Sequence, residues 1–132
     1  MTKVTEIFKC QVCNNIVEVI KSGEGELYCC NKPMIHLIEN KDDTASKEKH
    51  VPVFDEVDNK IKVGANTHPM LKEHYIEFIE AISPDKKYII RKYLNPGEEP
   101  TLETNYDWSN DVFIMRELCN LHGLWENKKE SN

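Results

Sequence analysis

Short apolar runs separated by polar, turn-forming segments are the main pattern of this chain. After residue 49 the runs are HVPVFDEV, NKIKVG, HYIEFIEAI, KYIIRKYL and DVFIMREL. Runs of this length, rich in β-branched and aromatic residues and bounded by Gly, Pro, Asn or Asp, are typical of β-strands. HYIEFIEAI also fits helical spacing, but its neighbours favour a strand. With a hairpin turn predicted at Asp58-Asn59, the pattern predicts an all-β sandwich or barrel of roughly seven short strands.

The first 38 residues form a different pattern, with too few apolar side chains for a core of their own. EIFKCQVCNNIVEVI and LYCCNKPMIHLI read as short extended pieces on either side of the flexible turn KSGEGE. Units below about 40 residues usually need a metal ion or disulfides for stability. Residues 1–38 are therefore predicted to be a small metal-binding knuckle.

Polar segments mark the boundaries of the remaining chain. Residues 39–49, ENKDDTASKEK, are nearly free of apolar side chains, which suits a linker whose last residues form an active-site loop. The sandwich is predicted over residues 50–126. The polar tail, residues 127–132, is expected to be disordered.

Charge and cysteine content narrow the functional classes. The 17 basic and 23 acidic side chains give a net charge of −6, which argues against a general nucleic-acid binder or a polybasic membrane contact. No apolar run approaches the roughly 18 residues of a membrane span, and the start of the chain lacks a secretory apolar core. We therefore expect a soluble cytoplasmic protein. Five cysteines, four of them within residues 10–30, fit a disulfide framework poorly and favour metal binding.

Four cysteines provide the donors of one tetrahedral site. Cys10-X2-Cys13 is followed by the adjacent pair Cys29 and Cys30, and four thiolates suit zinc or iron equally. Neighbouring side chains of a strand point apart, so the adjacent pair is expected to need a local bend that distorts the tetrahedron. The spacing does not choose between a structural zinc knuckle and an iron centre.

A second set of donors lies in the predicted sandwich. Of the five histidines, His36 is expected to be an ordinary surface or hydrogen-bonded residue. The others occur in EKHVP, THPMLKEH and CNLHG, near turn markers and near the fifth cysteine. A site of five ligands leaves one octahedral position open, as a catalytic centre requires, and favours iron over zinc. The predicted ligands are His50, His68, His74, Cys119 and His122.

These motifs resemble the two-iron superoxide reductases of the desulfoferrodoxin family. FKCQVCNNIVEV and LYCCNKPM are similar to the family's desulforedoxin-like domain, and KEKHVPV, VGANTHPMLKEHYIEFIE and CNLHGLW to the segments of its reductase centre. The likeness extends from Ile7 to Trp125. It implies an immunoglobulin-like β-sandwich behind a desulforedoxin-like knuckle, and usually a homodimer. Asn14 stands where the family commonly has glycine, and asparagine tolerates the left-handed conformation.

The resemblance also implies two iron ions and a reaction. One iron is held by the four cysteines, and the other by four equatorial histidines with Cys119 axial. The reaction is the one-electron reduction of superoxide to hydrogen peroxide without release of oxygen, with electrons from a rubredoxin-like donor. Lys49 is expected to attract the superoxide anion. Glu48 is expected to close the open position of ferric iron after turnover.

Three other functions fit parts of the sequence. A zinc knuckle fused to a β-sandwich could be a binding module, and an iron tetrathiolate alone could serve an electron carrier. A superoxide dismutase would share the substrate but would release oxygen. The open coordination position beside Glu48 and Lys49 favours the reductase.

Overall fold

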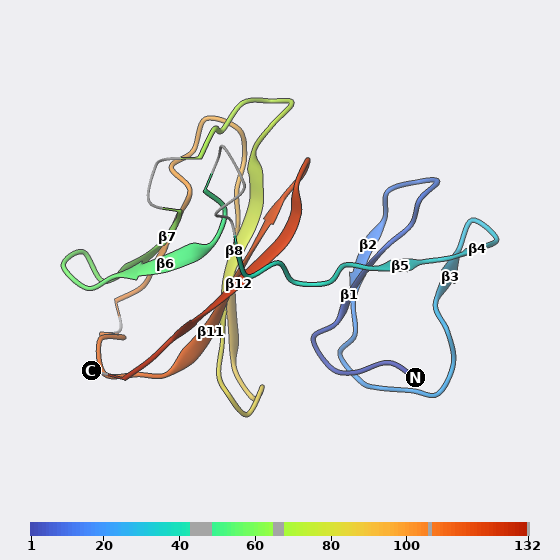
Figure 1. Ribbon diagram of the computed structural model, residues 1–132, viewed down its shortest axis with the longest axis horizontal. Helices are drawn as coiled ribbons and strands as arrows, with labels where there is room; N and C mark the ends of the chain where they lie inside the picture. Colours follow the sequence, from blue (N-terminus) through green and yellow to red (C-terminus); the bar gives the residue numbers. More distant parts are fainter. Residues whose placement is uncertain (43–48, 65–67, 106, 132) are drawn as a thin grey trace. The chain divides into compact units, whose positions relative to one another are not determined.

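The computed structural model describes residues 1–42, 49–64, 68–105 and 107–131. The chain forms two compact units, Met1–Ile38 and Glu39–Asn132. The described residues are arranged in β-strands and turns, with no helix among them, in agreement with the predicted all-β class (Figure 1). The described part contains no helix long and apolar enough to cross a membrane.

Five very short strands make up unit 1. β1, β2 and β5 form a three-stranded antiparallel sheet in the order β2-β1-β5, and β3 pairs with β4. Few large apolar side chains are buried, chiefly Ile7 and Val19. So small a core agrees with a unit that depends on a metal ion. The strands are β1 Ile7–Lys9, β2 Ile16–Glu18, β3 Tyr28–Cys29, β4 Lys32–Pro33 and β5 Ile35–His36.

Unit 2 is a sandwich of two antiparallel sheets, ordered β10-β7-β6 and β12-β11-β8-β9. The predicted hairpin turn is confirmed, with Asn59 at φ 52°, and HYIEFIEAI does form a strand. The sandwich strands are β6 Pro52–Asp55, β7 Lys60–Val63, β8 Ile76–Ile82, β9 Ile89–Tyr93, β10 Thr101–Glu103, β11 Phe113–Cys119 and β12 Gly123–Lys129.

Alternate residues of both sheets build the core of the sandwich. Ile61 and Val63 of β7, Ile79 of β8, and Phe113 and Met115 of β11 belong to one buried cluster. Cys119, at the end of β11, belongs to the same cluster and is 1% exposed. The alternation of side chains along β11 therefore directs this thiol to the inner side of the sheet.

The other face of the four-stranded sheet buries a network of charges. Arg116 donates from Nε and Nη2 to Oε2 of Glu80, at 3.1 and 2.8 Å. Arg91 donates from Nε to Oε1 of the same carboxylate at 2.8 Å, and Arg116 also pairs with Glu39 at 3.1 Å. Each charge of this network thus has an opposite partner, which its burial requires.

Two boundary predictions were wrong. The expected disordered tail is strand β12 through Lys129, whose buried Nζ donates to the carbonyl of Ser109 and lies over the Phe54 ring. The linker does not include Asn40, because the Asn40 N–H donates to the Leu124 carbonyl at 2.8 Å and adds this residue to the sandwich. Tertiary pairing, absent from the sequence pattern, orders residues 127–129 and Asn40.

Candidate metal centres

A two-residue turn brings the adjacent cysteines of unit 1 to one point. Cys29 ends β3, whereas Cys30 and Asn31 form the turn to β4 with φ values of 51° and 62°. Two consecutive positive φ values are the signature of a type I′ hairpin turn. This turn is the local bend that the adjacent pair was expected to need.

The four thiols form one cluster. The sulfurs of Cys10, Cys13, Cys29 and Cys30 all lie within 4.8 Å of one another. Asn14, next to Cys13, adopts the expected left-handed conformation at φ 66°, and its N–H donates to the Cys10 carbonyl. The cysteine pair of the first turn therefore faces the pair of the second, in the arrangement that a tetrahedral metal ion needs.

Hydrogen bonds within the cluster give these thiols different pKa values. The N–H groups of Cys13 and Val12 donate to the sulfur of Cys10 at 3.5 and 3.3 Å, and they lower the pKa of Cys10 to about 6. Contacts with the Cys13 and Cys10 sulfurs raise the pKa of Cys30 to about 12. Without a cation, these four thiols cannot all lose their protons. Such a cluster is suited to binding a metal ion, because the metal replaces the protons.

In unit 2, four imidazoles form a closed ring. The ring centroids of His50 and His68 are 4.8 Å apart, those of His68 and His74 4.8 Å, and those of His74 and His122 5.1 Å. The ring centroids of His122 and His50 are 4.9 Å apart and complete the ring. Each imidazole stands edge-on or nearly so to the next, at interplanar angles from 61° to 81°.

The thiol of Cys119 completes this second group. Its sulfur lies 3.7 Å from Nδ1 of His122, and that nitrogen lies 3.2 Å from Nε2 of His50. The five donor atoms all lie within 4.8 Å of one another. Four nitrogens around one point and a sulfur beside them fit an iron ion with one further position for a small ligand.

A tight hairpin loop places Cys119 and His122. Cys119 pairs with Gly123 across β11 and β12, so residues 120–122 form a three-residue loop, and Gly123 has φ 88°. A hairpin loop of this length requires a residue with positive φ at its end, which explains the glycine of CNLHG. The loop turns His122 back toward the Cys119 sulfur.

Asn120 joins this loop to the segment that carries His74. Its side-chain oxygen accepts the Tyr75 N–H at 2.9 Å, and its Nδ2 donates to the Glu73 carbonyl at 3.1 Å. His68 is oriented by its own neighbour, because its Nδ1 lies 2.7 Å from the Pro69 carbonyl. With the proton of His68 on Nδ1, Nε2 is the nitrogen that can bind a metal.

All nine predicted ligands are brought together in these two groups, and Lys49 lies directly before His50. The Lys49 side chain is partly exposed. Glu48 lies outside the described residues. Three further residues that contact this region were not singled out from the sequence: Gly64, Asn120 and Trp125. Their positions inside the motifs VGANTH and CNLHGLW were the available signal.

Two family models match the chain. One, described as Desulfoferrodoxin, matches residues 42–128, and the other, Desulfoferrodoxin, N-terminal domain, matches residues 2–37. The chain belongs to the desulfoferrodoxin family. As expected for this family, the chain has the donor sets of two iron centres, one with four cysteines and one with four histidines and a cysteine.

Relatives of similar length support the same assignment. A desulfoferrodoxin homolog of Archaeoglobus fulgidus is 48% identical, with 96% of this chain and 98% of the relative covered. A second homolog, from Methanothermobacter thermautotrophicus, is 46% identical, with 95% and 99% covered. The superoxide reductase of Treponema pallidum has a similar structure, with a TM-score of 0.68 and 25% identity over 92% of this chain and 95% of that one. The match confirms the desulfoferrodoxin architecture of knuckle and sandwich.

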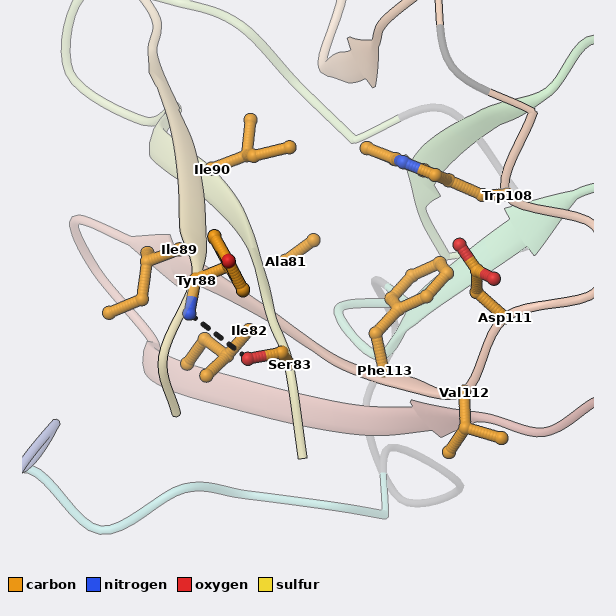
Figure 2. Close-up of a pocket in the computed structure, with 10 residues that line it drawn as sticks. All are labelled: Ala81, Ile82, Ser83, Tyr88, Ile89, Ile90, Trp108, Asp111, Val112 and Phe113. Atoms are coloured by element: carbon orange, nitrogen blue, oxygen red, sulfur yellow. Dashed lines mark hydrogen bonds between the residues drawn. The ribbon is translucent and has the colours of Figure 1, made fainter. Parts of the chain in front are cut away.

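A separate pocket of about 620 Å³ opens at the other end of the sandwich (Figure 2). It lies between the β8–β9 turn and the segment before β11, with Trp108 and Phe113 facing Ile90 across it. Phe113 begins β11 and Cys119 ends it, so about 20 Å of strand separates the pocket from the candidate iron site. The lining is mainly apolar and offers no histidine or cysteine.

Proposed function

We propose that this desulfoferrodoxin is a superoxide reductase, which reduces superoxide to hydrogen peroxide by one electron and two protons without releasing oxygen. The observation that carries the proposal is the ring of four imidazoles with the Cys119 sulfur beside it. The likeness to the Treponema pallidum superoxide reductase supports it. Iron bound there would supply the electron.

The proposed ligands divide into two sets. Each set has its donor atoms within 4.8 Å of one another. Cys10, Cys13, Cys29 and Cys30 would hold the tetrathiolate iron, and His50, His68, His74, Cys119 and His122 would hold the reactive iron. The first set has no position left for a substrate, because four thiolates complete a tetrahedron. The second set offers five donors, so an iron ion bound there would keep a position for a small ligand, where the proposed reaction would take place.

Lys49 is the proposed steering residue. The chain carries a net charge of −6, so an anionic substrate must be attracted by a local positive charge. Lys49 precedes the ligand His50 in sequence, and its backbone is held against Gly64. Its ammonium can also donate a hydrogen bond to the anion and orient it.

Glu48 and Cys119 have complementary proposed roles. Glu48 would offer a hard carboxylate oxygen, a donor that suits ferric iron, for the position that the five predicted ligands leave. The thiolate of Cys119 would donate electron density to an iron bound there and would make its ferrous state a stronger reductant. Both effects disfavour the oxidation of superoxide that a dismutase must also perform, so they favour the reductase over the dismutase.

The proposal also covers the electron donor, the oligomeric state and the cellular location of the protein. A rubredoxin-like protein is the proposed electron donor, the working form is a homodimer, and the protein acts in the cytoplasm. A binding module or a simple electron carrier would have no use for an open coordination position with the positive charge of Lys49 beside it. This feature favours the enzyme.

Cys119→Ser tests the proposal. The serine variant is expected to lose the absorption band from the Cys119 thiolate to the iron of the histidine site, seen in the oxidised protein, and most superoxide-reducing activity. The absorption of the tetrathiolate centre should stay unchanged. Cys13→Ser is the matched control, because it should alter the tetrathiolate spectrum and leave the thiolate-to-iron band in place. A Cys119→Ser protein that kept both band and activity would contradict the assignment.

A further inference from the structure

Trp125 contacts two of the four histidines of the ring. Its indole stacks on the His50 imidazole, with centroids 4.7 Å apart and an interplanar angle of 13°. Its Nε1 donates a hydrogen bond to the backbone carbonyl of His122 at 3.1 Å. One side chain therefore contacts both His50, just before β6, and His122, in the loop between β11 and β12.

The position of Trp125 follows from the pairing of β12. Trp125 lies opposite Glu117 of β11, two residues before Cys119, so it is on the inner side of the sheet with the thiol. Trp125 is 8% exposed and His50 is 1% exposed. The indole thus covers one face of a buried imidazole whose edges meet His68 and His122.

We propose that Trp125 is a positioning residue for the histidine-ringed iron centre of this chain. By stacking, it fixes the plane of the His50 ring, and by its N–H it fixes the carbonyl at the end of the loop that carries His122. Ligand rings held in this way need less reorganisation when the iron binds and when its charge changes. The inference concerns the iron centre and does not depend on the substrate.

The two contacts can be separated by substitution. Trp125→Phe keeps an aromatic face for His50 but has no N–H for the His122 carbonyl. Trp125→Leu removes both contacts. Trp108→Leu is the matched control, because Trp108 is the other tryptophan, is 5% exposed, and packs against Phe54 and Phe113 in the sandwich core.

The experiment measures iron release from the full-length, iron-loaded protein to a ferrous chelator, together with the visible spectrum after oxidation. Removal of such supporting contacts typically weakens metal binding by about 10- to 100-fold. We expect a loss of that size in Trp125→Leu and a smaller loss with a shifted thiolate-to-iron band in Trp125→Phe. The tetrathiolate iron of the same chain should be retained in both variants and is an internal control.

Trp108→Leu should lower the melting temperature yet release iron as the wild type does. Wild-type iron affinity and an unshifted band in both Trp125 variants would overturn the proposal, as would an equal iron loss in Trp108→Leu. If Trp125→Leu does not fold, Trp125→Phe decides alone. Failure of the reductase function is distinguishable, because the wild type would then bind iron at both centres but not reduce superoxide.

Discussion

Gly64 lies directly against the backbone of Lys49. A Cβ atom added to Gly64 would be 2.4 Å from the Lys49 carbonyl oxygen and 2.6 Å from its Cβ, and Gly64 has φ +70°. Gly64 also donates its N–H to the Val51 carbonyl at 3.0 Å. Only glycine allows β7 to end this close to the residue that precedes the ligand His50.

Gly64→Ala is therefore expected to displace Lys49 and slow the reaction with superoxide. The left-handed conformation should also cost about 1–2 kcal/mol of stability. Gly97→Ala is the control, because Gly97 has φ +88° but nothing within 4 Å of the added Cβ. Stopped-flow rates and melting temperatures should show a similar loss of stability in both variants and a slower reaction only in Gly64→Ala. Equal superoxide rates in the two would contradict the positioning of Lys49 by Gly64.

Lys49→Ala is expected to slow association with superoxide and to weaken its dependence on ionic strength, while both irons stay bound. The reason is that an exposed charge acts on a diffusing anion through an interaction that salt screens. The control is Lys128→Ala, at the opposite end of β12 from the hairpin loop. Rates measured at low and high salt decide. An unchanged rate at low salt would exclude Lys49 as the steering charge.

Asn120→Ala should loosen the link between the His122 loop and the segment that carries His74. It removes two side-chain hydrogen bonds to the Tyr75 N–H and the Glu73 carbonyl, worth about 1 kcal/mol each. Faster iron release from the histidine site is the expected result. Asn127→Ala is the control, because its Nδ2 donates to the Pro52 carbonyl at 2.9 Å and not to the segment that carries His74. Equal iron release from the two variants would contradict this role.

The β6–β7 hairpin provides a test of pH dependence. Lys62 lies 2.5 Å from Asp55 and lowers the pKa of that carboxyl, and the Asp58 and Val57 N–H groups also donate to it. The unfolded pKa is about 3.9, so the ion pair stabilises the fold above that pH and is lost as pH falls through the lower folded pKa.

Asp55→Asn should therefore be less stable than the wild type at pH 7, and the difference should shrink below about pH 4. Denaturant unfolding from pH 7 to pH 3, with iron content checked at each point, measures this. Glu56→Gln, an exposed charge removal on the same turn, is the control. A stability difference between wild type and Asp55→Asn that did not vary with pH would contradict the ion-pair account.

The sequence predicted most of the fold and both donor groups, for identifiable reasons. The chain has few cysteines and histidines, and their spacing near turn residues favours a role as metal ligands over other roles. The β8 and β11 strands were predictable because their apolar residues are many. Strand β12 was missed because its last residues are polar, and only pairing with β11 and the burial of Lys129 make it a strand.

Residues that act through contacts distant in sequence could not be predicted from it. The stacking of Trp125 on His50 joins positions 75 residues apart, and the contact of Gly64 with Lys49 depends on how β6 meets β7. The burial of Glu80 and Arg116 on the outer face was likewise not visible in a strand that alternates apolar and charged residues. Such effects are set by tertiary packing, not by local propensity.

The products formed from superoxide distinguish a reductase from a dismutase. Protein reduced at the histidine site is mixed anaerobically with superoxide, and hydrogen peroxide and oxygen are quantified together. Because each superoxide takes up one electron and two protons, a superoxide reductase yields one peroxide per superoxide consumed by the protein and no oxygen above the uncatalysed background. Oxygen formed in a catalytic amount beside the peroxide would indicate a dismutase, and no accelerated loss of superoxide would contradict an enzyme acting on it.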